Sequence, residues 1–211
     1  MKSYDQYCPI ASALDLVGER WSLLIVRELL QHGQLRYSDL HRALPGCGTN
    51  ILAARLKELE RGGVVTRRKL PPPAASAVYE LTRYGTALAP VLRELAHWGA
   101  RVMGPPTPEV ELPEGWLQDA LHIAMPPTST CIEFRIDDEI ASLVDGVVVA
   151  GPAEHPDVVV SGDARGFYDL VVDRDVDAVE VRGSRPALRA FLDALPAVVA
   201  APAAEPEPLR L

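Results

Sequence analysis

Leucines recur at helical spacing in the first half of the chain. Leu52, Leu56 and Leu59 stand at positions i, i+4 and i+7, which places them on one face of an amphipathic helix. This pattern predicts a helix over Thr49–Arg61. A shorter apolar pattern just before it predicts a second helix over Ser38–Leu44.

The residues that flank the longer helix indicate where it begins and ends. The segment Pro45–Gly48 interrupts the shorter helix, and we expect Thr49 to cap the longer one through its hydroxyl. Gly62 and Gly63 should end it, because glycine tolerates the left-handed conformation found after helices. Two helices joined by so short a turn predict a helix-turn-helix.

A β-hairpin is predicted directly after these helices. Val64–Thr66 and Val78–Leu81 are typical of strands, and a proline-rich loop joins them. We expect the basic residues Arg67, Arg68 and Lys69 at the tip of the hairpin, where they would suit contacts with phosphates. A helix-turn-helix followed by a basic hairpin indicates a winged helix-turn-helix.

The face of the longer helix opposite its leucines carries polar and small residues. It consists of Asn50, Ala54, Lys57 and Arg61, with Ala53 nearby. Small residues beside an amide and a cation let a helix approach the major groove and hydrogen-bond base edges. For this helix taken alone, the alternative is an ordinary solvated polar face.

The rest of the first half is predicted to be helical. Helices are expected over Pro9–Val17, Trp21–Gln31 and Arg83–Met103, the last capped by Thr82 and kinked or restarted at Pro90. The last helix has an apolar stripe that one small domain cannot cover, so we expect a two-fold partner to bury it. The predicted dimer interface comprises Leu88, Val91, Leu92, Leu95 and Trp98.

The second half has a different pattern, which predicts a small α+β domain. The expected strands are 130–136, 140–144, 147–150, 158–161 and 178–182, and the expected helices are 164–172 and 185–195. The predicted domains are therefore residues 1–104, a proline-rich linker at 105–115, a second domain at 116–197 and a disordered tail at 198–211. The predicted fold class of the whole chain is α+β.

Charge divides the chain in the same way. The formal net charge is −8, but residues 1–104 carry 14 basic and 9 acidic residues, whereas residues 105–211 carry 7 and 20. The balances are therefore +5 and −13, and only the first half is electrostatically suited to DNA. No run of about 18 apolar residues exists to span a membrane, and no signal peptide is evident, so we expect a cytoplasmic protein.

No arrangement of residues in the sequence indicates an enzyme. The histidines are scattered, the three cysteines form no zinc-binding spacing, and neither a phosphate-binding loop nor a dinucleotide-binding glycine motif occurs. We therefore expect no metal and no cofactor. Cys8 is the one candidate for redox chemistry, because a thiol at the start of a helix has a lowered pKa. The alternative is a small residue packed at the dimer interface.

Several short motifs together resemble the HxlR-type winged helix-turn-helix regulators. They are Cys8-Pro9, the run from Leu16 to Ile25, the run from Leu35 to Leu40, the wing ending in Tyr79–Thr82, and Leu88…Trp98-Gly99. The resemblance covers residues 7–103 and implies a dimeric bacterial transcription factor that binds a pseudo-palindromic double-stranded DNA operator. The candidate DNA-binding residues are Arg36, Ser38, Thr49, Asn50, Ala53, Ala54, Arg55, Lys57, Arg61, Arg67, Arg68 and Lys69.

The second half resembles the sterol-carrier-protein type 2-like domain. The segments Pro156–Asp163 and Val179–Ser184 carry this resemblance. It implies a curved sheet and helices around a tunnel for an apolar small-molecule effector. The alternative is a domain with a filled core, which would enlarge the dimer or repel non-specific DNA. The candidate ligand-binding residues are Phe134, Val148, Phe167, Leu170, Phe191 and Leu195.

The sequence therefore favours a ligand-responsive transcriptional regulator. Two alternatives stay open at this stage. One is a repressor that senses oxidants or electrophiles through Cys8, with an inert second domain. The other is a lipid-binding carrier whose winged domain serves protein contacts.

Overall fold

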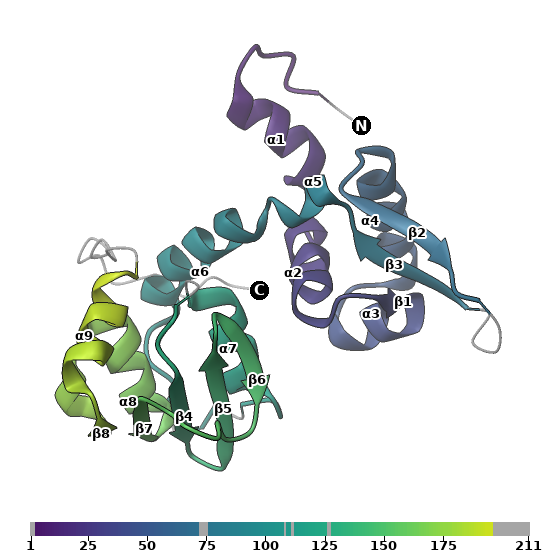
Figure 1. Ribbon diagram of the computed structural model, residues 1–211. Coiled ribbons are helices and arrows are strands. Elements are labelled where there is room, and N and C mark those ends of the chain that lie inside the picture. Colours follow the sequence, from purple (N-terminus) through teal and green to yellow (C-terminus); the bar gives the residue numbers. More distant parts are fainter. Residues whose placement is uncertain (1–2, 72–75, 108, 111, 126–127, 196–211) are drawn as a thin grey trace. The chain divides into compact units, whose positions relative to one another are not determined.

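A computed structural model describes residues 3–71, 76–107, 109–110, 112–125 and 128–195 (Figure 1). The chain divides into two compact units, Met1–Leu92 and Arg93–Leu211. The division falls inside a helix that the sequence assigned whole to the first domain. The second part of this helix belongs to the second unit, within which the Tyr168 hydroxyl donates a hydrogen bond of 3.0 Å to the carbonyl oxygen of Ala100. The predicted tail at 198–211 lies outside the described residues.

The first unit consists of helices followed by a hairpin. Its elements are α1 (Pro9–Val17), α2 (Ser22–His32), β1 (Leu35–Arg36), α3 (Tyr37–Ala43), α4 (Thr49–Arg61), β2 (Val65–Lys69), β3 (Ala77–Leu81), α5 (Arg83–Thr86) and the start of α6 (Ala89–Met103). Each predicted helix of this unit begins and ends within one residue of its predicted bounds. The strands lie in the order β1-β3-β2, and both pairs are antiparallel.

The core of the first unit is formed by α2, α3, α4 and the base of the hairpin. Ile25 and Val26 of α2 and Leu40 of α3 have no exposed surface, and all three leucines of the predicted α4 stripe are buried. Glu28 is an exception to the apolar character of α2: it is buried and forms an ion pair with Arg27. The apolar face of α4 is thus fixed against the core, which leaves its opposite face outward.

Pro90 interrupts the long helix as the sequence predicted. Helix α5 ends at Thr86 and α6 starts at Ala89, because proline cannot donate the backbone hydrogen bond that a continuous helix needs. Thr82 caps α5 as expected, and its Oγ1 accepts a hydrogen bond of 3.0 Å from the backbone nitrogen of Gly85.

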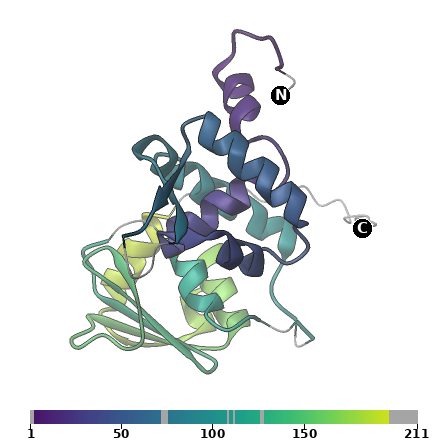
Figure 2. The same cartoon turned by 90° about the vertical axis from the view of Figure 1, so that its right-hand side faces the viewer.

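The second unit contains a sheet with helices along one face (Figure 2). Its elements after α6 are α7 (Trp116–Ala124), β4 (Ile132–Ile136), β5 (Glu139–Val144), β6 (Val147–Ala150), β7 (Val158–Gly162), α8 (Ala164–Tyr168), a π-helical turn (Asp169–Asp173), a 3-10 turn (Val176–Ala178), β8 (Glu180–Gly183) and α9 (Arg185–Asp193). The strand order is β6-β5-β4-β7-β8, with β4 and β7 parallel and the other pairs antiparallel.

The β5–β6 hairpin turns at the predicted Asp145-Gly146 pair. Both residues have positive φ angles, 50° and 76°, which is the backbone conformation of the tight two-residue turn that favours this pair. Helix α7, by contrast, was not predicted. In the described part of the chain, no helix is both long and apolar enough to cross a membrane.

Candidate nucleic-acid interface

The outward face of α4 carries the predicted base-reading residues. Asn50, Ala53, Ala54 and Lys57 are all exposed, whereas Leu52, Leu56 and Leu59 on the opposite face are at most 1% exposed. The side chains nearest the middle of the outward face are alanines, so a DNA groove could approach the helix closely. The amide of Asn50 and the ammonium of Lys57 can donate hydrogen bonds to base edges.

The start of α4 differs from the prediction. Thr49 is the first helical residue and Gly48 is the N-cap, without a side-chain capping bond. The backbone nitrogen of Leu52 donates a 3.0 Å hydrogen bond to the carbonyl oxygen of Gly48, so the helix begins one residue earlier than a Thr49 cap would allow. The predicted capping role of Thr49 was therefore wrong.

A tyrosine missed by the sequence analysis holds this end of α4. The hydroxyl of Tyr37, the first residue of α3, donates a hydrogen bond of 2.7 Å to the carbonyl oxygen of Thr49. The Tyr37 ring also stacks with that of His41, with 6.4 Å between ring centroids. Its place just before the predicted helix was the one available signal, because the bond joins residues 12 apart in the chain.

The basic residues of the wing lie on strand β2 and not at the tip of the hairpin. Arg67, Arg68 and Lys69 pair in register with Tyr79, Val78 and Ala77 of β3. Strand β2 extends through all three residues because each has a residue of β3 opposite it to pair with. Successive strand residues point to opposite faces, so Arg68 lies on the other face from Arg67 and Lys69.

Two of these wing cations have partners within the hairpin. The guanidinium of Arg67 lies 6.0 Å from the centre of the Tyr79 ring, and Arg68 forms an ion pair of 3.2 Å with Glu80. All three basic residues are exposed. They remain placed to approach a phosphate, although an approaching phosphate would compete with Glu80 for Arg68.

Arg55 differs from the other predicted phosphate contacts. Its side chain is only 18% exposed, and its Nη1 lies 2.7 Å from Glu58 and 3.3 Å from Glu19. Two carboxylates therefore neutralise this guanidinium within the protein. The structure places Arg55 in an ion-pair network that links α4 to the segment before α2, so we no longer assign it a phosphate contact.

The other candidates surround α4 at the surface. Arg36, Ser38, Thr49 and Arg61 are exposed. The backbone nitrogen of Arg36 donates a hydrogen bond of 3.2 Å to Asp39, which helps to start α3. The structure thus brings the start of α3 and the start of α4 to one surface.

Ile51 is an exposed apolar residue that the sequence analysis passed over. It lies in the first turn of α4 and its side chain is 47% exposed. An apolar side chain at this position could contact the methyl group of a thymine in a major groove. The signal in the sequence was its place between Asn50 and Leu52, off the leucine stripe.

The predicted dimer interface is only partly available on the surface. Val91, Leu95 and Trp98 are 52%, 44% and 68% exposed, and with Val102 they form one stripe along α6. Leu92, however, is 8% exposed and belongs to the core of its own unit. Leu88 is half-buried against the same core. We therefore withdraw Leu92 from the interface, because its side chain already packs within the first unit.

The cysteines lie on separate elements. Cys8 is the half-buried N-cap of α1, and Cys47 is buried in the turn between α3 and α4. Burial raises the pKa of the Cys47 thiol, and it also raises the pKa of Cys131, with a further contribution from the nearby Asp157 carboxylate. All three are free thiols in the structure.

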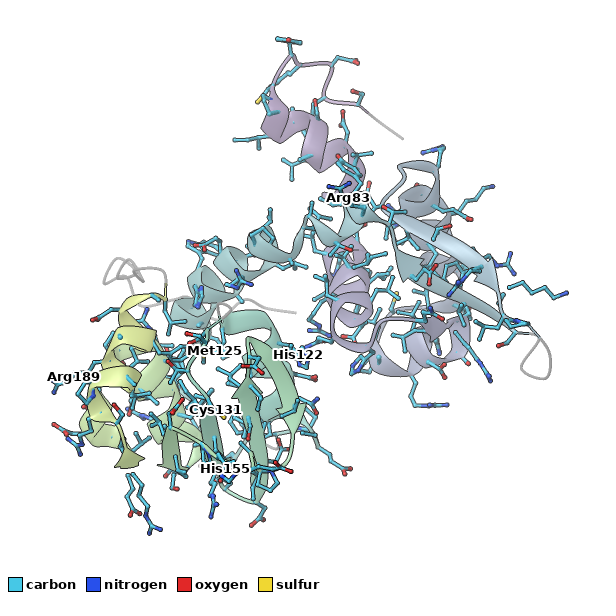
Figure 3. The ribbon with its side chains drawn as sticks, viewed as in Figure 1. Arg83, His122, Met125, Cys131, His155 and Arg189 are labelled. Carbon is cyan, nitrogen blue, oxygen red and sulfur yellow. The ribbon has the colours of Figure 1, made fainter. Side chains whose placement is uncertain are left out.

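The described residues contain no cluster of three or more histidine, cysteine or acidic side chains that could hold a metal ion. Figure 3 labels His122, Cys131 and His155, which belong to α7, to the segment before β4 and to the loop between β6 and β7.

The predicted ligand-binding residues form part of the core of the second unit. The rings of Phe134 and Phe167 meet edge to face, with 5.7 Å between their centroids. Leu170 has no exposed surface, Phe191 and Leu195 are each 4% exposed, and Val148 packs against the same core. These side chains therefore belong to one packed core cluster, in which Phe134 and Phe167 are in direct ring contact.

Comparisons with known proteins concern the first half of the chain. The HxlR-like helix-turn-helix family matches residues 16–106. The uncharacterized HTH-type transcriptional regulator YvaP of Bacillus subtilis (strain 168) is 41% identical over 101 residues, which are 47% of this chain and 93% of YvaP. The HTH-type transcriptional regulator YodB of the same organism is 37% identical over 99 residues, covering 46% of this chain and 88% of YodB.

A solved structure of YodB in its reduced form is 36% identical in sequence and has a TM-score of 0.42. The match covers 48% of the present chain and 100% of the YodB chain. The two sequence relatives are named as regulators of transcription and not as enzymes.

Proposed function

The chain belongs to the HxlR-like helix-turn-helix family of transcriptional regulators, and we propose that it reads a double-stranded DNA operator as a homodimer. The observation that carries this proposal is the exposed face of α4. Asn50, Ala53, Ala54 and Lys57 stand outward on a helix whose other face is locked into the core. In this proposal they face base edges in the major groove.

Phosphate contacts would come from the surface around that helix. Arg36, Ser38 and Thr49 lie at the starts of α3 and α4, and Arg67, Arg68 and Lys69 lie on the wing. The positive balance of residues 1–104 favours approach to DNA. With about six to ten phosphate contacts per dimer, operator affinity should fall steeply as salt is raised.

The proposed dimer contact is the apolar stripe of α6. Val91, Leu95, Trp98 and Val102 are spaced by four, three and four residues and are all exposed. Ile10 and Leu14 of α1 are also exposed apolar side chains. A second copy of the chain would cover such a stripe in an isologous contact. The two α4 helices would then enter successive major grooves about 34 Å apart.

The test of this function is selection of binding sites from a random double-stranded DNA library with the purified full chain. We expect enrichment of an inverted repeat whose half-sites lie about one helical turn apart. Analytical ultracentrifugation of the complex should give two chains for each selected site. Failure to enrich any sequence would refute operator reading, and a single chain on each site would refute the homodimer.

We propose residues 116–197 as a regulatory domain that resembles sterol carriers and takes an apolar effector. The packing of Phe134 against Phe167 means that such a ligand would displace side chains rather than enter an open tunnel. Native mass spectrometry of the purified protein tests this idea. A co-purified apolar molecule, lost in a Leu170→Asp variant, would support it, whereas a wild-type mass that matches the bare chain would argue against it.

Cys8 carries a second candidate mechanism, which is a switch by oxidants or electrophiles. It is half-buried and lies at the start of α1, beside the exposed Ile10. In this proposal the exposed apolar side chains of α1 join the dimer contact, so a covalent change at Cys8 would alter that contact. Treatment with diamide should then weaken operator binding in the wild-type protein and not in Cys8→Ser. Equal responses of the two proteins would exclude Cys8 as the sensor.

A further inference from the structure

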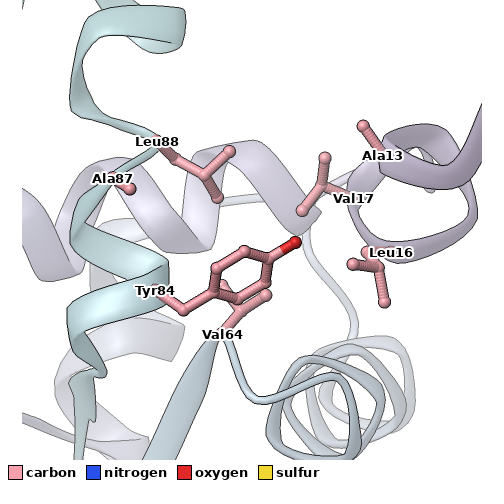
Figure 4. Close-up of a pocket in the computed structure, with 7 residues that line it drawn as sticks. All are labelled: Ala13, Leu16, Val17, Val64, Tyr84, Ala87 and Leu88. Carbon is pink, nitrogen blue, oxygen red and sulfur yellow. The ribbon is translucent and has the colours of Figure 1, made fainter. Parts of the chain in front are cut away.

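An apolar cavity, open to solvent on one side, lies within the first unit, and none of its lining residues belongs to α4. Its volume is about 130 Å³. Its walls come from α1, from the residue before β2, and from α5 with the segment that follows it (Figure 4). The lining residues are Ala13, Leu16, Val17, Val64, Tyr84, Ala87 and Leu88.

The chemistry of the walls defines what the cavity can hold. Six of the seven lining side chains are aliphatic, and the hydroxyl of Tyr84 is the one polar group among them. Figure 4 shows this hydroxyl directed toward α1, near Val17. Tyr84 is 60% exposed, and Ala13 and Ala87 are exposed as well, so the cavity opens to solvent along these residues. An enclosed apolar cavity of about 150 Å³ binds benzene, so the volume here is close to that of one six-membered ring.

The walls of the cavity are tied directly to the DNA-reading helix. The backbone nitrogen of Val64 donates a 2.9 Å hydrogen bond to the carbonyl oxygen of Leu59 in α4, and its own carbonyl oxygen accepts one of 3.0 Å from Thr82. The end of α4 therefore shares a wall residue with the cap of α5.

Two glycines show how closely these elements approach one another. A Cβ atom at Gly62 would lie 2.9 Å from Leu16 of α1, and a Cβ atom at Gly85 would lie 2.1 Å from the carbonyl oxygen of Val64. The elements beside the cavity are thus closely packed against one another, namely α1, the end of α4, and α5. A molecule that pressed α1 and α5 apart would therefore strain the contacts that these elements make with the end of α4.

We propose that this cavity binds a neutral aromatic molecule with one six-membered ring, and that its occupation weakens DNA binding. The aliphatic walls would contact the ring, and Tyr84 could hydrogen-bond a single polar substituent. Displacement of α4 relative to the elements that precede α6 would change the separation of the two reading helices in the dimer. The regulatory half of the inference rests on the proposed operator binding, whereas the binding half does not.

Fluorine NMR of the full chain tests the binding half, with fluorobenzene as the probe. We expect saturable binding with a Kd on the order of 1 mM or tighter. Ala13→Leu and Ala87→Leu add side-chain volume inside the cavity and should each weaken binding by about tenfold or more. Ala190→Leu makes the same addition on the exposed side of α9 and should bind like the wild type.

A wild-type protein that gives no saturable signal would overturn the site, as would equal binding by all three variants. A second measurement does not depend on how the variants fold. In the wild-type protein, fluorobenzene should shift the methyl resonances of Ala13 and Ala87 and leave that of Ala190 unchanged. Shifts confined to other methyl groups would place the probe elsewhere and overturn the proposal.

The regulatory half is tested by operator affinity with and without saturating fluorobenzene. We expect the wild-type Kd for the selected DNA to rise about fivefold, and the Kd of Ala13→Leu to stay constant. A wild-type protein that binds the probe and keeps its DNA affinity would overturn the regulation. A protein that binds the probe but selects no DNA would refute the proposed function and leave the cavity site standing.

Discussion

The Tyr37 hydroxyl and the Thr49 carbonyl oxygen are joined by a hydrogen bond of 2.7 Å. Because these are the first residues of α3 and α4, the bond links the starts of the two helices of the helix-turn-helix. Asn50, the first proposed base-reading residue, follows directly after the acceptor. The position of the reading surface therefore depends on a side chain that does not itself belong to that surface.

Tyr37→Phe removes this bond and keeps the ring. We expect the free energy of unfolding to fall by about 0.5–1.5 kcal/mol. Operator affinity should fall by the same factor for every operator sequence, because no base contact is lost. Urea titration and gel-shift assays would measure the two effects. Tyr7→Phe is the matched control, because the Tyr7 side chain is fully exposed. Unchanged stability in Tyr37→Phe would show that the bond contributes nothing.

Arg55→Ala should affect stability more than DNA binding. Its guanidinium is paired with Glu19 and Glu58, and loss of such partly exposed pairs typically costs about 0.5–1 kcal/mol. The dependence of operator affinity on salt should keep its wild-type slope. Arg67→Ala serves as the comparison, and we expect it to lower that slope by about one. A lowered slope in Arg55→Ala would restore it as a phosphate contact.

Gly85→Ala should destabilise the first unit. The added Cβ would lie 2.1 Å from the carbonyl oxygen of Val64, so the backbone must shift, at a cost of about 1–3 kcal/mol. Gly99→Ala is the control, because nothing lies within 4 Å of a Cβ atom there. That change should be neutral or stabilising by up to about 1 kcal/mol. Thermal unfolding of both variants measures the difference, and equal melting temperatures would contradict the close approach.

Local pattern predicted most of the helices and strands of the chain. The leucine spacing of α4, the proline at the start of α6 and the Asp145-Gly146 turn each act within a few residues, so the sequence displays them directly. Helix α7 is different. The carboxylate of Glu139 in β5 accepts hydrogen bonds from the backbone nitrogens of Gly115 and Leu117, at 2.6 and 3.0 Å. The helix also has a local signal, because Leu117 and Leu121 stand four residues apart and are both fully buried, but nine residues between a proline-rich segment and a strand made that short pattern easy to miss.

The same distinction holds for the candidate site. The outward face of α4 follows from helical periodicity, and the exposed residues agree with it. The ion pairs of Arg55 and the burial of Leu92 do not follow from periodicity. Arg55 meets Glu19, and Leu92 meets the core of the first unit, only once the chain has folded. Periodicity identifies a surface, but packing decides which of its side chains are free to bind.

Stability at alkaline pH should depend on Cys47. Burial raises the pKa of this thiol above its ordinary value of 9.0. Its contribution to stability is therefore complete below the pKa of the unfolded chain and is lost as the pH rises through the native pKa. Urea unfolding at about pH 8 and about pH 10 should show a larger loss in the wild type than in Cys47→Ala. Equal losses would contradict the raised pKa.

Trp98→Glu should separate the proposed dimer. The indole is 68% exposed and lies in the middle of the α6 stripe, so a charge there would be buried without a partner in a dimer. Sedimentation velocity should show a dimer for the wild type and a monomer for the variant. Trp98→Phe keeps an apolar ring and should remain dimeric. A dimeric Trp98→Glu protein would place the interface elsewhere.

The central claim is that the outward face of α4 reads bases, and a comparison of specificity tests it most directly. Wild type, Asn50→Ala and Lys57→Ala should be titrated against the selected operator and against every single-base change in one half-site. Arg189→Ala, an exposed cation in the second unit, is the control. We expect Asn50→Ala and Lys57→Ala each to lose about 1–3 kcal/mol of binding free energy and to stop discriminating at one position. Wild-type affinity and wild-type discrimination in both variants would contradict the claim.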